Sequence, residues 1–229
     1  MIELLERNHG EPARQFAYRV LLFNIVNLNL KPGQEIQETE LCKLMGVSRT
    51  PVHEALLTLS MKKLIDIYPQ RGTFVALIDM EYVEAVRFNR YVLESAVVKL
   101  ACDYDSANPH LENLEENVIL QQLYLKSKNF NKLLELDAGF HRNIFALCNK
   151  ETAYTLLDDM MPHFDRERKL SFEALSPAQI VDDHILILDA IKEKNKDEAV
   201  RLMELHLSRA LADQQRLCEE YPHYFKITD

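Results

Sequence analysis

Two short helical patterns joined by a tight turn lie within residues 32–75, and they constrain the fold more than any other stretch. From Glu38 to Met45, apolar residues recur at helical spacing, and Gly46 follows directly. Ser48 then offers a hydroxyl that can cap a second helix, which the apolar pattern carries through Leu59. The sequence therefore predicts a helix, a turn and a second helix.

A hairpin pattern follows the second helix. Residues 65–68 and 73–77 alternate apolar and polar side chains, as strands do, on either side of a turn at 69–72. That turn contains Gly72 and has a cation, Arg71, at its tip. Two helices followed by such a hairpin predict a winged helix-turn-helix, in which the second helix enters the major groove of DNA.

The second helix has one face suited to DNA and one suited to a core. Arg49, Thr50 and His53 fall near its start, where a recognition helix presents side chains to phosphates and base edges. The opposite face is apolar and is expected to pack inward; it consists of Val52, Ala55, Leu56 and Leu59. The residues that we expect to contact DNA are Lys43, Ser48, Arg49, Thr50, His53, Arg71 and Gly72.

The segments GVSRTPVHEAL and QRGTFV resemble the signature of the GntR family of bacterial transcription regulators. The resemblance implies a DNA-binding regulator. Where the family usually has the arginine of PVREAL, this chain has His53, which lacks the fork of five donors with which arginine binds guanine. The operator of relatives is therefore not transferred to this chain. The alternative for the segment is a winged helix that serves protein contacts only.

Charge divides the chain in two. The 229 residues suffice for two modest domains, and the formal net charge is −9. Residues 1–79 contain nine Lys and Arg against nine Asp and Glu, so the negative excess lies in residues 80–229. We expect a DNA-binding domain over 1–79 and an effector-binding and dimerisation domain over 80–229. A neutral module can bind DNA when its cations share one face, and a homodimer doubles the contacts.

The cysteines and the first 14 residues indicate the cellular compartment in which the protein is expected. The four cysteines, Cys42, Cys102, Cys148 and Cys218, are too far apart in sequence for a zinc-ribbon pair, so reduced thiols are expected. Residues 1–14 are mixed and charged, which does not fit a signal peptide or a membrane span. We therefore expect a cytoplasmic protein with no membrane partner.

Beyond Asp79 the pattern is almost wholly helical. Apolar residues recur at three- and four-residue spacing in six segments: Met80–Tyr104, Leu111–Lys126, Phe130–Cys148, Glu151–Phe164, Pro177–Lys194 and Asp197–Cys218. Short connections between them predict an antiparallel bundle of about six helices, so the fold class is mainly α. The stretch 166–176 is the longest irregular candidate, and we expect a solvated loop or a mobile flap there.

Four polar residues share the inward faces of three of these helices. Asp137 and His141 are four residues apart and therefore stack on one face, while His184 and His206 lie on the apolar faces of later helices. Each histidine alone would suit a hydrogen-bonded core position. Three imidazoles and one carboxylate together favour one divalent transition metal, such as zinc, nickel or manganese, with an open position.

The bundle segment is similar to the ligand-binding domain of the FadR subfamily of GntR regulators. There an Asp-x3-His pattern and two later histidines hold a metal, which DAGFH, His184 and His206 resemble over residues 80–223. RYVLE resembles the Arg-x3-Glu of the first bundle helix, which implies that Arg90 anchors an effector carboxylate. The alternative is a surface pair between Arg90 and Glu94 worth a few tenths of a kcal/mol. Asn149 also matches the family, as a residue at a helix C-terminus.

Together these features predict a transcription regulator and not an enzyme. A small carboxylate bound at the metal would alter two winged helices and so control a two-fold-symmetric operator, most often as a repressor in this family. The metal is either structural or itself the sensed signal. A metal-dependent hydrolase is the alternative from another class, with Asp182 or Asp183 as base, although either acid can instead orient His184. A purely architectural DNA binder would leave the inward polar cluster unexplained.

Overall fold

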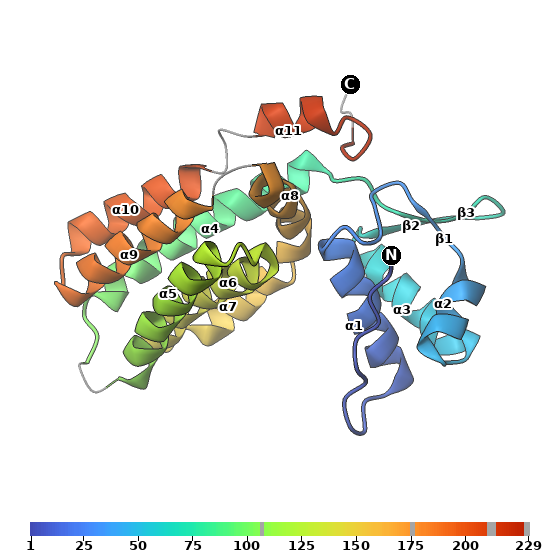
Figure 1. The fold of residues 1–229 in the computed structure, drawn as a ribbon, viewed down its shortest axis with the longest axis horizontal. Coiled ribbons are helices and arrows are strands. Elements are labelled where there is room, and N and C mark those ends of the chain that lie inside the picture. The colour runs from blue at the N-terminus through green and yellow to red at the C-terminus, as the bar shows by residue number, and fades with distance from the viewer. Residues whose placement is uncertain (106–107, 175–176, 210–213, 227–229) are drawn as a thin grey trace. The chain divides into compact units, whose positions relative to one another are not determined.

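The chain forms two compact units in a computed structural model, which describes residues 1–105, 108–174, 177–209 and 214–226 (Figure 1). The N-terminal unit comprises Met1–Val83, Pro162–Lys169 and Leu217–Asp229. The bundle unit comprises Glu84–Met161 and Leu170–Arg216. Helices dominate, with one small sheet, which confirms the mainly α fold class with an N-terminal helix-turn-helix.

Residues 1–79 of the N-terminal unit form three helices and a three-stranded antiparallel sheet. The helices are α1 (Ala13–Val26), α2 (Glu38–Met45) and α3 (Arg49–Met61). The strands are β1 (Glu35–Ile36), β2 (Ile65–Tyr68) and β3 (Gly72–Val75), in the order β1-β3-β2. The predicted helix pair and hairpin are thus present, whereas α1 and β1 had not been predicted.

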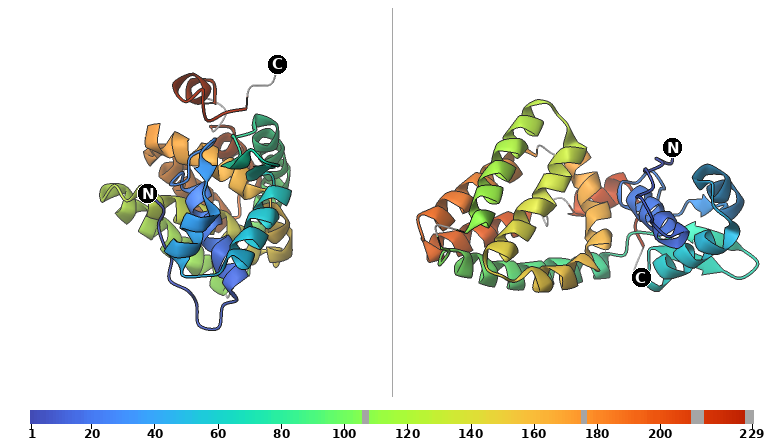
Figure 2. Two further views of the ribbon diagram at one scale, coloured as in Figure 1. Left: turned by 90° about the vertical axis from the view of Figure 1, so that its right-hand side faces the viewer. Right: turned by 90° about the horizontal axis from the view of Figure 1, so that it is seen from below.

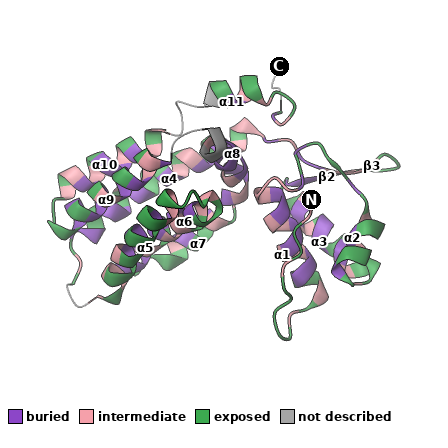
Figure 3. Cartoon of the chain, viewed as in Figure 1, coloured by how far each residue is buried: buried purple, intermediate pink, exposed green. Residues whose placement is uncertain are grey.

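Of the two features predicted for the turn between α2 and α3, the glycine turn is present and the serine cap is not. Gly46 takes a left-handed φ of 64°, which glycine adopts without a steric cost, and it ends α2 as expected. Ser48 occupies the N-cap position of α3, but its hydroxyl accepts no hydrogen bond from the helix backbone, so the capping expectation is wrong. The apolar face of α3 is fully buried as predicted, because its residues pack into the core that α1 also lines (Figure 3).

Eight helices follow residue 79 within the described part of the chain. They are α4 (Met80–Ala101), α5 (Pro109–Lys126), α6 (Phe130–Leu147), α7 (Glu151–Asp158), α8 (Met161–Ala174), α9 (Ala178–Lys192), α10 (Lys196–Arg209) and α11 (Gln214–Glu220). Asn108 and Asn129 cap α5 and α6 by accepting hydrogen bonds from backbone N–H groups of the first turns. Asn149 follows α6 with a positive φ of 53°, as a residue at a helix C-terminus often does.

Two predicted elements differ from the structure. The expected helix 151–164 is divided into α7 and α8, and the stretch from Arg166 to Ala174, expected as a loop, belongs to α8; residues 175–176 lie outside the described part. Apolar periodicity does not predict α8, because its Arg, Glu and Lys residues interrupt the apolar repeat. These residue types nevertheless have a high helix propensity. The expected helix 197–218 spans α10 and α11, and its residues 210–213 are likewise outside the described part.

The bundle unit has its own apolar core, to which α4, α5, α6, α9 and α10 contribute. α9 packs against α10, and α5 packs against α6. In the right-hand view of Figure 2, α5 and α6 form an inverted V that opens away from the connection between them. Each of these helices turns a buried face inward and an exposed face outward (Figure 3). None of the described helices is long and apolar enough to cross a membrane.

Candidate metal centre and nucleic-acid interface

The predicted DNA-contacting residues lie at the surface of the N-terminal unit. Ser48, Arg49, Thr50 and His53 are exposed around the start of α3, and Lys43 is exposed on α2. In the turn between β2 and β3, Arg71 is exposed, and its guanidinium carbon lies 5.7 Å from the centre of the Tyr68 ring. Gly72, the first residue of β3, is half-buried with a φ of 120°. Cations and hydroxyl groups on α3 and at a hairpin tip are the groups with which winged helices contact nucleic acid.

One glutamate holds two of these residues. Glu38 Oε2 accepts a hydrogen bond from Arg49 Nε at 3.0 Å, and Glu38 Oε1 lies 3.1 Å from His53 Nδ1. Burial raises the pKa of Glu38, but the contacts with His53 and Arg49 outweigh it, so that the pKa lies below its ordinary value. Arg49 and His53 are therefore oriented before any DNA arrives. Nothing in the sequence pattern distinguishes Glu38 as their partner, because it lies in a short acidic stretch at the start of α2.

The four predicted metal ligands come together in the bundle unit. Asp137 and His141 are on α6, His184 is on α9 and His206 is on α10, and all four are buried. Their potential ligand atoms lie within 4.8 Å of one another. Residues far apart in the sequence thus form one polar cluster inside an otherwise apolar core.

The spacing inside the cluster suits a metal ion. His206 Nε2 lies 3.2 Å from His141 Nε2 and 3.4 Å from His184 Nε2, and His184 Nε2 lies 3.7 Å from Asp137 Oδ1. Ligand atoms about 2.1 Å from one metal are about 3.0 Å apart at a right angle and about 3.4 Å apart in a tetrahedron. The two separations between histidine nitrogens match this range, and the separation of 3.7 Å between His184 Nε2 and Asp137 Oδ1 is slightly longer.

Each histidine turns its other ring nitrogen toward an acceptor oxygen. His141 Nδ1 lies 2.6 Å from Glu94 Oε2, and His184 Nδ1 lies 2.8 Å from Gln121 Oε1. His206 Nδ1 is 3.5 Å from an oxygen of Asp183. An acceptor beside Nδ1 places the proton of a neutral imidazole on that atom, which leaves the lone pair on Nε2. The lone pairs of His141 and His184 therefore point into the cluster, an arrangement that a cation stabilises; the longer contact of His206 Nδ1 is not a hydrogen bond.

A hydrogen-bonded chain fixes the partner of His184. Asn117 Nδ2 donates to the backbone oxygen of Leu136 at 2.9 Å, and Gln121 Nε2 donates to Asn117 Oδ1 at 2.6 Å. Because a carbonyl oxygen only accepts, this order leaves Gln121 Oε1 to accept from His184 Nδ1. A Cβ at Gly139 would lie 3.1 Å from Asn117 Nδ2, so the glycine of DAGFH leaves room for this approach of α5 to α6.

Burial keeps two of the histidines uncharged. It lowers the pKa of His141, against the attraction of Glu94, and it lowers the pKa of His184 well below the ordinary value, with His206 adding to the effect. Neutral imidazole is the form that binds a metal. The donor set of three imidazoles and one carboxylate fits zinc, nickel or manganese.

Glu94 joins the cluster to Arg90. Arg90 Nε donates to Glu94 Oε1 at 2.6 Å, and the side chains are only 6% and 2% exposed, so the alternative of a surface pair is wrong: the pair exists but is buried. Burial alone would raise the pKa of Glu94, yet Arg90 and His141 bring it down to about 2. Burial alone would lower the pKa of Arg90, yet Glu94 raises it overall. The guanidinium thus lies beside the cluster as a permanent cation.

Asp182 and Asp183 were expected to include a residue that orients His184. Neither orients His184, whose Nδ1 faces Gln121 instead. Asp183 precedes His184 by one residue and therefore lies about 100° around α9 from it. It lies beside His206 of α10 and accepts hydrogen bonds from Arg209 at 2.7 and 3.2 Å. Gln121 gave no signal in the sequence, since a glutamine on an amphipathic helix is common. Glu94 belongs to RYVLE, where the four-residue spacing indicates a partner of Arg90 but not of His141.

Comparisons with known proteins agree with this architecture. A family model described as "Bacterial regulatory proteins, gntR family" matches residues 13–75, and a model of the FCD domain matches residues 85–209. The HTH-type transcriptional repressor RspR of Escherichia coli is 30% identical over 219 residues, covering 95% of this chain and 96% of that protein. The chain belongs to the GntR family. A regulator from Streptomyces ambofaciens is also 30% identical, over 96% of this chain and 93% of its own length.

Solved structures show the same fold. Escherichia coli McbR/YncC superposes with a TM-score of 0.76 at 20% identity, over 90% of this chain and 98% of that chain. The FCD domain contains the buried cluster of Asp137 and the three histidines. As a GntR-family member with an FCD domain, the protein is a DNA-binding transcription regulator and not an enzyme.

Proposed function

We propose that this GntR-family protein is a repressor whose affinity for a two-fold-symmetric operator is controlled by a small carboxylate bound at a metal site in the bundle. The observation that carries the proposal is the convergence of three buried imidazole Nε2 atoms and a carboxylate within 4.8 Å. Relatives named as repressors support the sign of regulation: RspR, and the gluconate operon repressor of Bacillus subtilis at 23% identity over 81% of this chain.

One divalent transition metal per chain would be held by Asp137, His141, His184 and His206. When bound, such an ion offers a Lewis-acidic position to an anionic oxygen. The chain's own contribution is orientation, since Glu94 and Gln121 hold the Nδ1 atoms of His141 and His184 and so aim their Nε2 atoms inward. Zinc, nickel and manganese all suit this donor set.

The effector would be a small carboxylate that also contacts Arg90. A buried guanidinium is a partner for carboxylates, and this one lies near enough to Asp137 for each to affect the other's charge. Arg90 is bound to Glu94, which in turn contacts His141. A ligand that moved Arg90 would therefore act directly on the side chain that orients a proposed metal ligand.

DNA contact would involve Lys43, Ser48, Arg49, Thr50, His53, Arg71 and Gly72. Their exposure around the first turn of α3 and at the hairpin tip supports this assignment. A two-fold operator requires a homodimer, whose two recognition helices would contact the two half-sites.

The outer face of α4 supports dimerisation through the bundle unit. Phe88 and Val92 are 68% and 49% exposed one turn apart, and Ala96 is exposed on the next turn. Two copies of α4 packed antiparallel about residues 91–92 would bring Glu84 of one copy level with Lys99 of the other. This charge complementarity favours a second copy of the chain as the occupant of the face.

Calorimetry tests the effector proposal. Candidate organic and sugar acids are titrated into the parent, the metal-stripped protein and Arg90→Lys, which keeps the charge beside Glu94 but loses the planar fork. The effector that shifts operator affinity should bind the stripped protein and the variant at least about tenfold more weakly, while Arg142→Lys on the exposed face of α6 behaves as the parent.

The effector proposal also requires that effector binding changes the affinity of the protein for DNA. An effector that changes operator affinity about 100-fold requires a coupling of about 2.7 kcal/mol. Equal effector affinity in parent, stripped protein and Arg90→Lys would place the effector site elsewhere. A change of operator affinity on adding the metal alone, with no acid present, would show instead that the metal is the sensed signal.

A further inference from the structure

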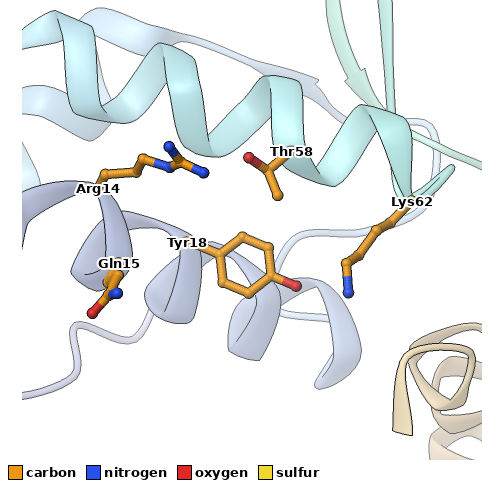
Figure 4. Close-up of a pocket in the computed structure, with 5 residues that line it drawn as sticks. All are labelled: Arg14, Gln15, Tyr18, Thr58 and Lys62. Atoms are coloured by element: carbon orange, nitrogen blue, oxygen red, sulfur yellow. The ribbon is translucent and has the colours of Figure 1, made fainter. Parts of the chain in front are cut away.

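A pocket of about 330 Å³ lies in the N-terminal unit between α1 and α3 (Figure 4). Its lining residues are Arg14, Gln15 and Tyr18 of α1 together with Thr58 and Lys62 at the end of α3. Thr58 is nine residues after Arg49, about 13 Å along the helix axis, so the pocket is separate from the proposed DNA contacts. No residue of the proposed metal and effector site belongs to it.

The lining combines two cations with an aromatic ring. In Figure 4 the ring of Tyr18 lies in the middle, with its hydroxyl directed toward Lys62, while the guanidinium of Arg14 extends toward Thr58. Thr58 donates its hydroxyl proton to the backbone oxygen of Glu54 at 2.9 Å. Its methyl group, the ring and the stem of Lys62 therefore supply apolar surface between two positive ends.

Acidic groups are missing from the lining. The sequence of α1 contains no Asp or Glu, and Glu54, one turn before Thr58, is not a lining residue. Arg19, on the next turn of α1 after Arg14, is paired with Glu11 at 2.8 Å. Arg14 has no ion pair within the described part of the chain, and it lies in the first turn of a helix, where the helix dipole disfavours a cation. A bound anion would offset this unfavourable charge.

We propose that this pocket binds a small organic anion with a flat apolar body, namely an aromatic carboxylate or an aromatic phosphate ester. The ring of the ligand packs against Tyr18, and its anionic group is held by Arg14. The volume lies within the range of small-molecule sites, and the lining of mostly apolar surface with a few polar groups is typical of them. This second ligand site is independent of the bundle centre.

The chain contains no tryptophan, so Tyr18→Trp places a unique fluorescent reporter in the pocket. The full-length variant is titrated with phenyl phosphate and with benzoate, which separates the two anionic groups, and with phenol as the neutral analogue. We expect saturable changes in tryptophan emission with at least one anion and binding of phenol at least about fivefold weaker. Adding Arg14→Ala should weaken anion binding about fivefold, whereas Lys63→Gln, which changes an exposed cation outside the lining, should not.

Two further measurements keep the result independent of the reporter and of the bundle. Amide NMR shifts of the parent protein should move around residues 14–18 and 58–62 on adding the anion. A variant lacking His184 and His206 should retain binding, since neither residue contacts the pocket. The proposal is overturned if neither anion saturates below about 10 mM, a weak-fragment limit, or if phenol binds as tightly as the anions. It is also overturned if Lys63→Gln weakens binding as much as Arg14→Ala.

Discussion

The N-terminal unit and the bundle unit each contain a glutamate that holds one arginine and one histidine. Glu38 contacts Arg49 Nε at 3.0 Å and His53 Nδ1 at 3.1 Å. Glu94 contacts the same two atom types, Arg90 Nε and His141 Nδ1, both at 2.6 Å. The chemistry of the two triads is the same, and the surroundings differ.

Burial gives the two triads different capacities. The side chains of Arg49 and His53 are 78% and 50% exposed, whereas those of Arg90 and His141 are 6% and 2% exposed. At the surface, water replaces either partner of Glu38 at small cost, so these side chains can turn to DNA phosphates. Inside the bundle no water can replace a partner of the Glu94 carboxylate, so Arg90 and His141 stay in place. The exposed triad is thus suited to exchange partners, and the buried one to hold a site in place.

The largest effect should follow from breaking the buried triad. Glu94→Gln leaves Arg90 as a buried cation without its carboxylate and should lower the free energy of unfolding by about 3–5 kcal/mol. Urea unfolding of the parent and variant measures this change. Glu135→Gln removes an exposed carboxylate that contacts Lys132 and should change the free energy by less than about 0.5 kcal/mol. Similar values for the two variants would mean that burial does not distinguish the triads.

Removing two proposed metal ligands should have the next largest effect. His184→Ala combined with His206→Ala should abolish bound metal and lower stability by about 2.7 kcal/mol when free metal is 100-fold above its Kd, because a metal that binds only the folded state stabilises it. Elemental analysis and thermal melts with and without a chelator measure both quantities. His223→Ala, an exposed histidine, serves as the control. Undiminished metal in the double variant would place the metal elsewhere.

In the exposed triad, Arg49→Ala should weaken operator binding by about 1–3 kcal/mol if the guanidinium contacts a base or phosphate. Its side chain is largely exposed, so the stability of the protein should hardly change. Binding is measured by fluorescence anisotropy at several salt concentrations, with Arg201→Ala in the bundle unit as the control. Operator affinity equal to that of the parent at matched salt would exclude Arg49 from the interface.

The smallest effect concerns Glu38→Gln. Loss of this negative charge beside Arg49 and His53 should tighten DNA binding by about 0.5 kcal/mol. The lowered pKa of Glu38 means that its stabilising contribution is present above its ordinary value of 4.5 and is lost as the pH falls through the lowered pKa. Parent and variant should therefore differ in melting temperature near neutral pH and converge in acid. A difference that grows as the pH falls would contradict the assignment.

The sequence determined the elements whose cause is local. The inner face of α3 and the inward placement of Asp137, His141, His184 and His206 follow from a period of 3.6 residues, since an apolar stripe must be buried wherever the helix packs. Gly46 determined the turn between α2 and α3, because it takes a positive φ freely. Apolar periodicity failed to predict α8, because the charged residues of this helix interrupt the apolar repeat.

The tertiary structure decided which groups meet. Glu94 reaches His141 from α4 and Gln121 reaches His184 from α5, across separations of 47 and 63 residues, and no local pattern encodes such pairs. Whether Arg90 and Glu94 form a surface pair or a buried one depended equally on what packs over α4. Periodicity gives the face on which a side chain lies. The order and approach of the helices give its neighbours, and those neighbours set its charge state and the direction of its lone pairs.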